Sequence, residues 1–376
     1  MYNPFAIQKY LGPENFCDRE DELASLKSAF DNQRNVVLSS IRRYGKTSLI
    51  QHFHHLLSQG KDTICVYADV LNTQSDQDFA KRLISSVLTQ IHLNESRVTK
   101  LLQSFAFLRP KVELDPLTGM PNVSVSVETA SEVNMSLESL FALIKSRKET
   151  FQIAIDEFQQ IANYKITRTI DATLRTLMTT TPNVHFVFLG SERNLLNRLF
   201  INPNEPFYLS SEMMNLDKIE KGKYREFIIS KFDLAGKTIE SAMVDDILDW
   251  TQIHTFYTQF LCNTLYANSQ RDITWNDVNE AKIKAISAYE NLYQNYTRIF
   301  SKNQWKLIKA IAAEEEVSEI YSKSFLNKYR FSSSSLKQSL STLIDQQMIL
   351  EDYRADKIYY RVYDLFLAKW IQYKQI

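Results

Sequence analysis

Gly45, Lys46 and Thr47 form a short run whose residue types suit the binding of a phosphate chain. A glycine lets the backbone pass close to phosphate oxygens, a lysine neutralises their charge, and a threonine hydroxyl binds Mg²⁺. The apolar run Val36–Leu38 precedes these residues, and Ser48–Ile50 begins an apolar helix after them. A strand, a loop and a helix in that order place backbone N–H groups and the positive end of a helix around the phosphates. The pattern predicts a nucleotide-binding loop.

The predicted loop departs from the usual phosphate-loop pattern at one position. The consensus G-x-x-x-x-G-K-[ST] begins with a glycine, where this chain has Ser40. We expect binding to survive the change because Lys46 and Thr47 are both present. The residues expected to line the nucleotide are Ser40, Ile41, Arg42, Arg43, Tyr44, Gly45, Lys46, Thr47 and Ser48.

Asp156 and Glu157 are a second pair of residues whose types could carry out chemistry. They come directly after the apolar run Ile153–Ile155. Two acids at the end of a buried strand are costly unless they face a metal ion or solvent. Beside a phosphate loop, the aspartate is expected to hold Mg²⁺ through water, while Thr47 binds the ion directly. The glutamate is expected to orient and deprotonate an attacking water as a general base.

Ser191 ends a further apolar run that begins at Val184, and we expect it to contact the γ-phosphate or the attacking water. A plain strand-end turn is the competing interpretation. Arg193 and Arg198 follow on a predicted helix, where each either acts as an arginine finger or faces solvent. The sequence leaves these alternatives open.

The apolar runs around these residues predict the elements that must position them. Strands are expected at Val36–Leu38, Thr63–Asp69, Ile153–Ile155 and Val184–Ser191. Their near-continuous apolar character is typical of a parallel sheet covered by helices on both faces. Because such sheets bind ligands beyond the carboxyl ends of their strands, the loop, the acids and Ser191 are expected to meet at one edge.

The segment 109–127 has a different period, because Val123, Val125 and Val127 alternate with serines after a Pro-Leu-Thr-Gly turn. The alternation predicts an inserted hairpin with one solvent-facing side. Two interpretations remain, a partner surface and a decoration of the domain.

From about Met214 the pattern becomes helical and shows no further strand before the last segment. Four helices, near 221–231, 241–250, 256–267 and from Thr274 toward Tyr296, predict a bundle that could close over the nucleotide. After about residue 297, helices through Ala313, over 318–328 and after the serines at 332–335 precede a hairpin of 348–353 with 357–362. Three helices and such a hairpin predict a winged helix.

A winged helix often reads DNA, but this one carries a modest set of basic residues. A protein contact or a lid role is the alternative interpretation. The residues that could reach phosphates are Lys323, Lys328, Arg330, Lys337, Arg354, Lys357 and Arg361.

Composition narrows the class of protein. The 376 residues carry a formal net charge of zero, so the net charge of the molecule does not attract it to nucleic acid or to anionic membranes. The three cysteines are isolated, which fits a reducing cytoplasm. No apolar run reaches the roughly 18 residues of a membrane span, so we expect a cytoplasmic protein without membrane contact.

The chain resembles the archaeal-type ATPase family, a branch of the STAND and AAA+-like P-loop NTPases that is also common in Bacteroidetes-type bacteria. The residues that carry the resemblance are Asn3-Pro4-Phe5, Phe16 to Glu22, Arg42 to Leu49, Pro110 with Asp115 to Gly119, Ile155 to Gln160, Gly190-Ser191, His254 to Gln259, and Tyr363-Asp364 through Trp370-Ile371. The sequence departs from the family at Ser40, at Thr255, where the lid usually has a proline, and at 209–211, which lacks a frequent arginine.

The resemblance implies an ASCE-type P-loop NTPase domain at 1–213, with the hairpin inserted, a helical lid at 214–296 and a winged helix at 297–376. It implies ATP and Mg²⁺ as ligands. Lys46 would neutralise the β- and γ-phosphates, Thr47 and Asp156 would hold the metal, and Glu157 would be the general base. Ser191 or Gln160 would position the γ-phosphate, and His254 would touch the nucleotide from the lid.

The expected function is that of a slow ATPase acting as a nucleotide-controlled conformational switch. A protein partner or self-association is expected, since a neighbouring copy could supply the arginine that the chain lacks. The alternatives are an ATP-controlled DNA-binding protein, akin to origin-recognition-type initiators, and a scaffold that binds nucleotide without hydrolysing it.

Overall fold

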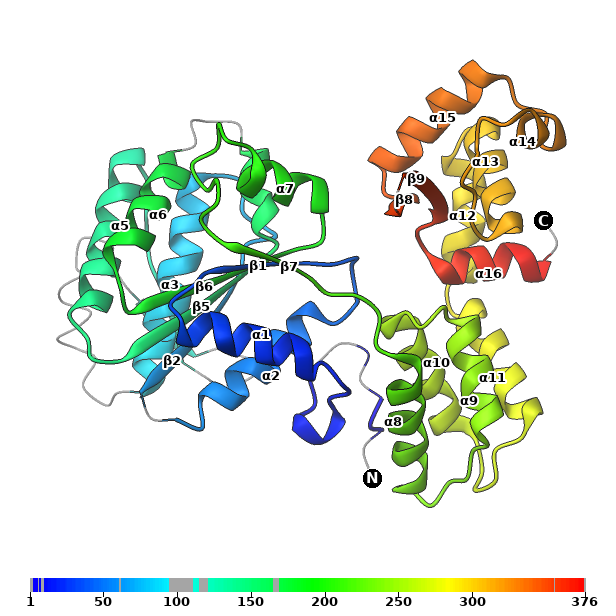
Figure 1. Cartoon of the computed structure of the whole chain (residues 1–376), viewed down its shortest axis with the longest axis horizontal. Coiled ribbons are helices and arrows are strands. Elements are labelled where there is room, and N and C mark those ends of the chain that lie inside the picture. The colour runs from blue at the N-terminus through cyan, green and yellow to red at the C-terminus, as the bar shows by residue number, and fades with distance from the viewer. Residues whose placement is uncertain are drawn as a thin grey trace. The chain divides into compact units, whose positions relative to one another are not determined.

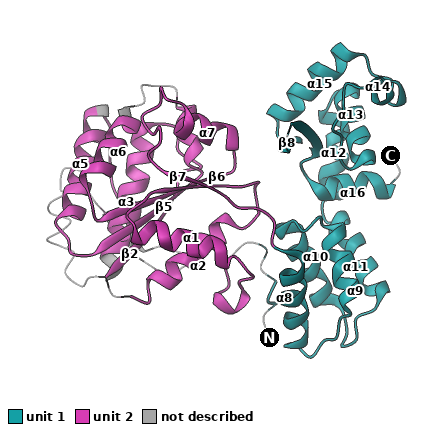
Figure 2. Cartoon of the chain, viewed as in Figure 1, with its two compact units in different colours: residues 1–8, 220–376 teal, residues 9–219 magenta. Residues whose placement is uncertain are grey.

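The computed structural model describes residues 3–5, 7, 10–60, 62–94, 111–114, 121–164, 169–354 and 356–374. The chain divides into two compact units (Figure 2). The sheet unit is Lys9–Ile219, and the helical unit combines Met1–Gln8 with Glu220–Ile376. The three domain ranges expected from the sequence, 1–213, 214–296 and 297–376, stay a prediction.

The sheet unit is built on a five-stranded sheet in the order β2-β5-β6-β1-β7, in which all neighbouring strands are parallel (Figure 1). The predicted α/β fold is therefore confirmed. One strand, β6, lies between the strand before the phosphate loop and the strand that ends in the two acids. The five strands are β1 (Val36–Ser39), β2 (Thr63–Asp69), β5 (Thr150–Asp156), β6 (Val184–Gly190) and β7 (Glu212–Asn215).

The strand β7 was not expected, because the sequence was interpreted as helical from about Met214. Its residues are mostly exposed and show no apolar run. It forms because its backbone pairs with β1, in register from Val36 with Glu212 to Ser39 with Asn215. An edge strand held by main-chain hydrogen bonds leaves little hydrophobic signal in a sequence.

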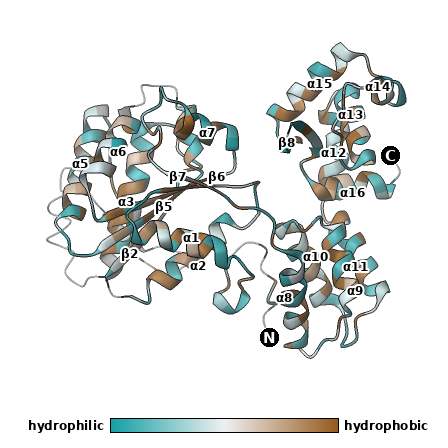
Figure 3. Cartoon of the chain, in the orientation of Figure 1, coloured by the Kyte–Doolittle hydropathy of each residue, from teal (hydrophilic) through white to brown (hydrophobic). Residues whose placement is uncertain are grey.

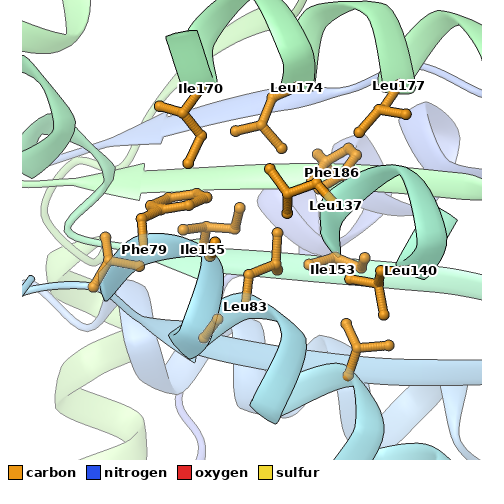
Figure 4. Packing of buried hydrophobic residues seen from close by; sticks show 14 of the residues in the cluster. Phe79, Leu83, Leu137, Leu140, Ile153, Ile155, Ile170, Leu174, Leu177 and Phe186 are labelled. Carbon is orange, nitrogen blue, oxygen red and sulfur yellow. The ribbon is translucent and has the colours of Figure 1, made fainter. Parts of the chain in front are cut away.

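Helices cover both faces of the sheet, as its apolar strands require. On one face, α1 (Glu20–Asp31) and α2 (Lys46–Leu57) share a core with β1 and β6. The other face packs on a larger core, and Figure 4 shows side chains of three helices meeting those of β5 and β6. The helices on that side are α3 (Asp76–Asn94), α5 (Ala130–Lys145), α6 (Thr169–Thr180) and α7 (Arg193–Ile201), and short 3₁₀ helices lie at η1 (Pro13–Asn15) and η3 (Phe158–Asn163).

A hairpin of β3 (Lys111–Leu114) and β4 (Pro121–Ser124) occupies the segment with alternating valines. The second strand ends at Ser124, earlier than the alternation suggested. Val123 and Val127 are fully buried in the larger core, and the Val123 N–H donates to Thr89 Oγ1 at 3.0 Å. The hairpin is thus tied to α3, and its turn lies outside the described residues.

The first part of the helical unit is a bundle of five helices. The single helix expected from Thr274 toward Tyr296 is two helices, which separate at Ala288 and Tyr289. The predicted cap is present, since Thr274 and Asp277 form a capping box. The helices are α8 (Lys221–Asp233), α9 (Ser241–Trp250), α10 (Thr255–Asn268), α11 (Trp275–Ser287) and α12 (Glu290–Ile299).

The N-terminal motif Asn3-Pro4-Phe5 is an anchor on this bundle. The Asn3 amide donates to the Asn263 carbonyl at 3.0 Å, and the Asn263 amide donates to the Phe5 carbonyl at 2.9 Å. The Phe5 ring is buried, and its centroid lies 5.2 Å from the centroid of the Phe232 ring. The motif therefore has a packing role within the helical unit.

The last part of the helical unit confirms the predicted winged helix. The second helix is shorter than expected, because Ser322 caps it and it begins only at Lys323. Val317 pairs with Tyr360 and extends the wing by an isolated bridge. The elements are α13 (Lys302–Glu314), α14 (Lys323–Lys328), α15 (Ser333–Asp345), β8 (Ile349–Arg354), β9 (Lys357–Val362) and α16 (Leu365–Lys374).

Two motifs that carried the family resemblance contact each other inside the helical unit. The Tyr257 hydroxyl donates to Asp364 Oδ1 at 3.1 Å and accepts the Leu365 N–H at 3.1 Å. The Tyr293 hydroxyl donates to Asp364 Oδ2 at 3.1 Å. These bonds join the helical bundle to the helix that ends the winged helix.

Hydropathy follows this architecture (Figure 3): the central strands are hydrophobic, and the outer helices carry both kinds of residue. Within the described part of the chain, the structure has no helix with the length and apolar character that crossing a bilayer requires.

Candidate functional site

The predicted phosphate loop connects β1 to α2 and turns sharply at Gly45. That glycine has φ 101°, a left-handed conformation that costs side-chain-bearing residues energy. It allows α2 to begin at Lys46, so the N–H groups of Lys46, Thr47 and Ser48 have no acceptor earlier in the helix. The loop therefore presents a helix N-terminus of the kind that binds phosphate.

Lys46 is held inside the loop by neutral groups. Its side chain is buried, and Nζ donates to Ser40 Oγ at 3.2 Å and to the Ser40 carbonyl at 3.5 Å. Burial lowers the lysine pKa, against the opposing attraction of Asp156 and Glu157. An ammonium group so placed gains from an anionic ligand. Ser40, the departure from the loop consensus, thus orients the lysine.

Thr47 and Asp156 meet at the point where a metal ion is expected. The Thr47 hydroxyl donates to Asp156 Oδ2 at 2.9 Å, and the Tyr67 hydroxyl from β2 donates to the same oxygen. Asp156 is only 5% exposed. A hydroxyl and a carboxylate at the edge of a phosphate loop are hard oxygen donors that suit Mg²⁺ with substrate phosphates. The residues fit the ion, and no cluster of three or more acidic, histidine or cysteine ligands occurs among the described residues.

Glu157 follows in a left-handed conformation, with φ 57°. Its Oε2 accepts hydrogen bonds from Ser191 Oγ at 3.1 Å and from the Gln159 amide. Such a backbone costs about 1 kcal/mol for a residue other than glycine. The conformation turns the carboxylate toward the end of β6, where Ser191 lies.

Gly190 makes room for this arrangement. A Cβ atom at that position would lie 2.1 Å from Gln159 Oε1 and 2.8 Å from Leu196 Cδ1. Gln159 itself is buried. The close approach of Gln159 to the β6 backbone lets its amide reach Glu157.

Arg42 links the phosphate loop to the same strand end. Its Nε donates to Ser191 Oγ at 3.3 Å, and a terminal nitrogen lies 3.8 Å from Glu192 Oε1. The Ser40 N–H donates to the Gly190 carbonyl at 3.3 Å. The loop, Ser191 and Glu157 are therefore contiguous.

Other candidates from the sequence face elsewhere. The Gln160 amide donates to the Thr73 carbonyl at 3.2 Å, and the choice between Ser191 and Gln160 as the γ-phosphate contact stays a prediction. Arg193 lies 3.9 Å from Asp217, and Arg198 donates to the Ala162 carbonyl at 3.4 Å. His254 caps α10 in the helical unit, and its predicted nucleotide contact stays a prediction.

The remaining loop residues differ in what they can offer a nucleotide. Tyr44 is buried in the α1–α2 core, and the half-buried Ile41 packs against it. Arg43 adopts φ 63° within the loop. Sequence reasoning missed Tyr67 and Gln159, because their roles depend on strand order and on a close backbone approach.

Comparison with known proteins agrees with this geometry. The sequence profile of a family described as an ATPase domain predominantly from Archaea matches residues 16–252. The chain belongs to this ATPase family. A second profile, described as a probable winged helix domain, matches residues 291–373. A search of curated proteins found no match.

Solved structures with a similar fold include three archaeal proteins. The Walker-type ATPase PAby2304 of Pyrococcus abyssi is 18% identical with a TM-score of 0.66, over 98% of this chain and 99% of that one. The ORC2 protein of Aeropyrum pernix, in ADPNP and ADP complexes, is 14% identical with a TM-score of 0.55, over 99% and 98%. Its ORC1 protein, in complex with DNA, is 12% identical with a TM-score of 0.52, over 95% and 92%. At these identities the likeness concerns the fold alone.

Proposed function

We propose that this protein is a Mg²⁺-dependent ATP hydrolase. The observation that carries the proposal is the Thr47–Asp156 hydrogen bond, which joins the phosphate loop to the acidic strand in one site. Membership in the ATPase family supports the choice of reaction. The preference for ATP over GTP rests on that membership and on the ADPNP and ADP held by the similar ORC2 protein.

In this proposal each residue of the site has a defined role. Lys46 donates to the β- and γ-phosphates, and Thr47 and Asp156 hold Mg²⁺, which offsets phosphate charge when bound. Glu157 accepts a proton from the attacking water. The two hydrogen bonds to Glu157 described above both reach Oε2, so we assign Oε1 as the oxygen that accepts the proton. Ser191 fixes the carboxylate and contacts the γ-phosphate.

We further propose that nucleotide state controls a conformational switch between the two units. Separate compact units, linked where the chain passes from one to the other, allow such a change. ATP must bind one arrangement more tightly than ADP does, because a ligand shifts an equilibrium only by its differential affinity. Slow hydrolysis would then set the lifetime of the ATP state.

DNA is the weaker of the two partner classes. The winged helix and the likeness to a DNA-bound ORC1 favour it. Against it, several basic residues expected to contact phosphates lie within ion-pair distance of acids inside the winged helix itself. Arg354 lies 2.6 Å from Glu316, Lys328 lies 2.6 Å from Glu314, and Arg361 lies 3.1 Å from Asp352. We therefore propose a protein partner or a second copy for this domain.

A binding and turnover experiment tests the function. Wild type, Lys46→Ala and the control Lys27→Ala, an exposed lysine of α1, are titrated with fluorescent ATP and GTP and assayed for phosphate release. We expect wild type and Lys27→Ala to bind ATP and release phosphate with Mg²⁺ but not with EDTA. Lys46→Ala is expected to do neither. ATP binding without any phosphate release would favour the scaffold function instead.

The partner class is tested separately by fluorescence anisotropy with duplex DNA. A DNA-binding function predicts an affinity that falls steeply between low and moderate salt, because phosphate contacts release counterions. We expect weak binding whose affinity does not change between the ATP- and ADP-bound protein. Tight binding that depends on the nucleotide would reverse the preference.

A further inference from the structure

We propose that Arg42 is the arginine that stabilises the transferring γ-phosphoryl group, acting on the nucleotide bound to its own chain. The proposal rests on the ATPase function proposed above and assigns a catalytic residue within that site. Segment 209–211, Leu-Ser-Ser, lacks the arginine that is frequent there in the family that the chain resembles. Arg42 would supply the positive charge at the γ-phosphate in its place.

The position of the Arg42 guanidinium carries the proposal. Its Nε donates to Ser191 Oγ at 3.3 Å, and the same hydroxyl donates to Glu157 Oε2 at 3.1 Å. One hydroxyl thus separates the guanidinium from the proposed general base. Because the base must stand beside the water that attacks the γ-phosphorus, Arg42 lies at the reacting end of the nucleotide.

The guanidinium is also free to change its partner. Its ion pair with Glu192 is long, at 3.8 Å, and the two side chains are 42% and 35% exposed. Pairs of this kind contribute little energy. In contrast, a phosphate whose negative charge grows in the transition state can accept two strong hydrogen bonds from the planar guanidinium. Arg42 can therefore leave Glu192 for the γ-phosphate while its Nε stays near Ser191.

Other arginines of the sheet unit are less suitable. Arg193 lies 3.9 Å from Asp217, a pair as weak as that of Arg42 with Glu192, and Arg198 donates to the Ala162 carbonyl at 3.4 Å. Of these three arginines, Arg42 is the one that donates to Ser191, which in turn donates to Glu157. Arg193 is the competitor in the test.

The reaction needs no group beyond those named. The water oxygen forms a bond to the γ-phosphorus while the bond from that phosphorus to the ADP oxygen breaks. The electron pair of the broken bond leaves on ADP, and the proton of the water goes to Glu157. Arg42 donates hydrogen bonds to the oxygens whose charge grows, and it forms no covalent bond. Replacing a residue in this role lowers kcat far more than it weakens the binding of ADP.

The test compares Arg42→Gln, Arg42→Lys, Arg193→Gln and Arg198→Gln with wild type in single-turnover hydrolysis and ADP binding. We expect Arg42→Gln to lower the rate by about 10³-fold or more, the loss typical of a missing arginine finger. Its ADP affinity should stay within about threefold of wild type. Arg42→Lys should recover part of the rate, and Arg198→Gln, an exposed residue of α7, should match wild type.

A mixing experiment tests whether the arginine acts within its own chain. Lys46→Ala keeps Arg42 but cannot hold ATP, whereas Arg42→Gln holds ATP but lacks the arginine. We expect an equimolar mixture to be no more active than Arg42→Gln alone, and the wild-type rate per chain to be independent of protein concentration. Activity restored by mixing would overturn the proposal in favour of an arginine from a second copy.

Other results separate this proposal from the proposed function. If wild type hydrolyses ATP, Glu157→Gln does not, and Arg42→Gln is as fast as wild type, the function stands and the role of Arg42 is wrong. A loss in Arg193→Gln instead would move the role to that residue. A parallel loss of ADP binding in Arg42→Gln would make it a structural part of the loop. If wild type never releases phosphate, both proposals fail together.

Discussion

The Thr47 hydroxyl donates a 2.9 Å hydrogen bond to Asp156 Oδ2, although 109 positions separate the two residues in sequence. The strand order explains the contact: β6 lies between β1, which leads into the phosphate loop, and β5, which ends at Asp156. The two oxygen donors of the proposed metal site therefore meet because of the sheet, and each depends on the other for its orientation.

Thr47→Val removes the hydroxyl without changing the size of the side chain. We expect the affinity for ATP to fall about 10–100-fold when Mg²⁺ is present, the scale of losses at metal sites, and to change little in EDTA. Thr47→Ser keeps the donor and should behave as wild type. Calorimetric titrations with and without Mg²⁺ measure the difference, and equal losses in both conditions would argue against a metal role.

Tyr67→Phe tests the second hydrogen bond to Asp156. Burial raises the pKa of Tyr67, so its hydroxyl stays protonated and donates at any working pH. We expect a several-fold rise in the Mg²⁺ concentration needed for half-maximal turnover, and a stability loss of about 1 kcal/mol.

The matched control for that change is Tyr164→Phe, which removes a buried hydroxyl that bonds to Thr73 Oγ1 at 2.6 Å. It should lose similar stability without altering the Mg²⁺ dependence. If both variants shift the Mg²⁺ dependence alike, the effect belongs to stability and not to Asp156.

Gly190→Ala tests the close approach that positions Gln159. The new methyl group would meet Gln159 Oε1 at 2.1 Å and Leu196 Cδ1 at 2.8 Å, so both side chains or the backbone must shift. We expect a loss of about 1–3 kcal/mol in stability and slower hydrolysis, because Gln159 then releases Glu157. Gly60→Ala, whose Cβ would have its nearest neighbour at 3.4 Å, should change neither quantity. A Gly190→Ala protein with wild-type melting and turnover would show that the contact is not needed.

The stability of the sheet unit should fall in acid because of His54. Burial lowers the pKa of His54 from 6.5 to about 4, and its imidazole bonds to the buried Gln152. Between those two values the unfolded chain binds more protons than the folded one, so stability falls as the pH drops through that window. From pH 7 to pH 5 we expect a loss of about 2 kcal/mol from this residue.

Urea unfolding of wild type and His54→Gln at pH 7 and pH 5 measures this loss. The variant should lose less stability than wild type over the same interval, since glutamine does not titrate. An identical difference in the two proteins would mean that other groups control the acid response.

Much of the fold follows from patterns in the sequence. The phosphate-loop strand, the acidic strand and the strand ending near Ser191 were all predicted, because buried parallel strands are continuous apolar runs. The winged helix followed from serine caps such as Ser301 with Gln304, which the structure confirms. What escaped prediction was β7, an exposed edge strand formed by backbone pairing, and the break near Ala288, which no glycine or proline marks.

The site residues that could be predicted are those in the phosphate loop and those at the ends of apolar strands. Lys46, Thr47, Asp156, Glu157 and Ser191 come together in the structure, as the shared strand edge required. Tyr67 and Gln159 were not predicted, since nothing in the sequence near them signals that Tyr67 contacts an acid of the neighbouring strand β5 or that Gln159 contacts Glu157. Such second partners depend on register and on side-chain direction, which a single sequence does not reveal.

Glu157→Gln is the most direct test of the proposed hydrolysis. It removes the proposed proton acceptor but keeps the size of the side chain and one oxygen that can accept from Ser191 and Gln159. Phosphate release and Mg²⁺-ATP binding should be measured on the same samples of wild type and variant. We predict that wild type turns over, and that the variant binds ATP with unchanged affinity while its rate falls by about 10²–10⁴-fold. A variant that releases phosphate as fast as wild type would contradict the assignment of Glu157, and a wild type that binds ATP and never releases phosphate would contradict hydrolysis itself.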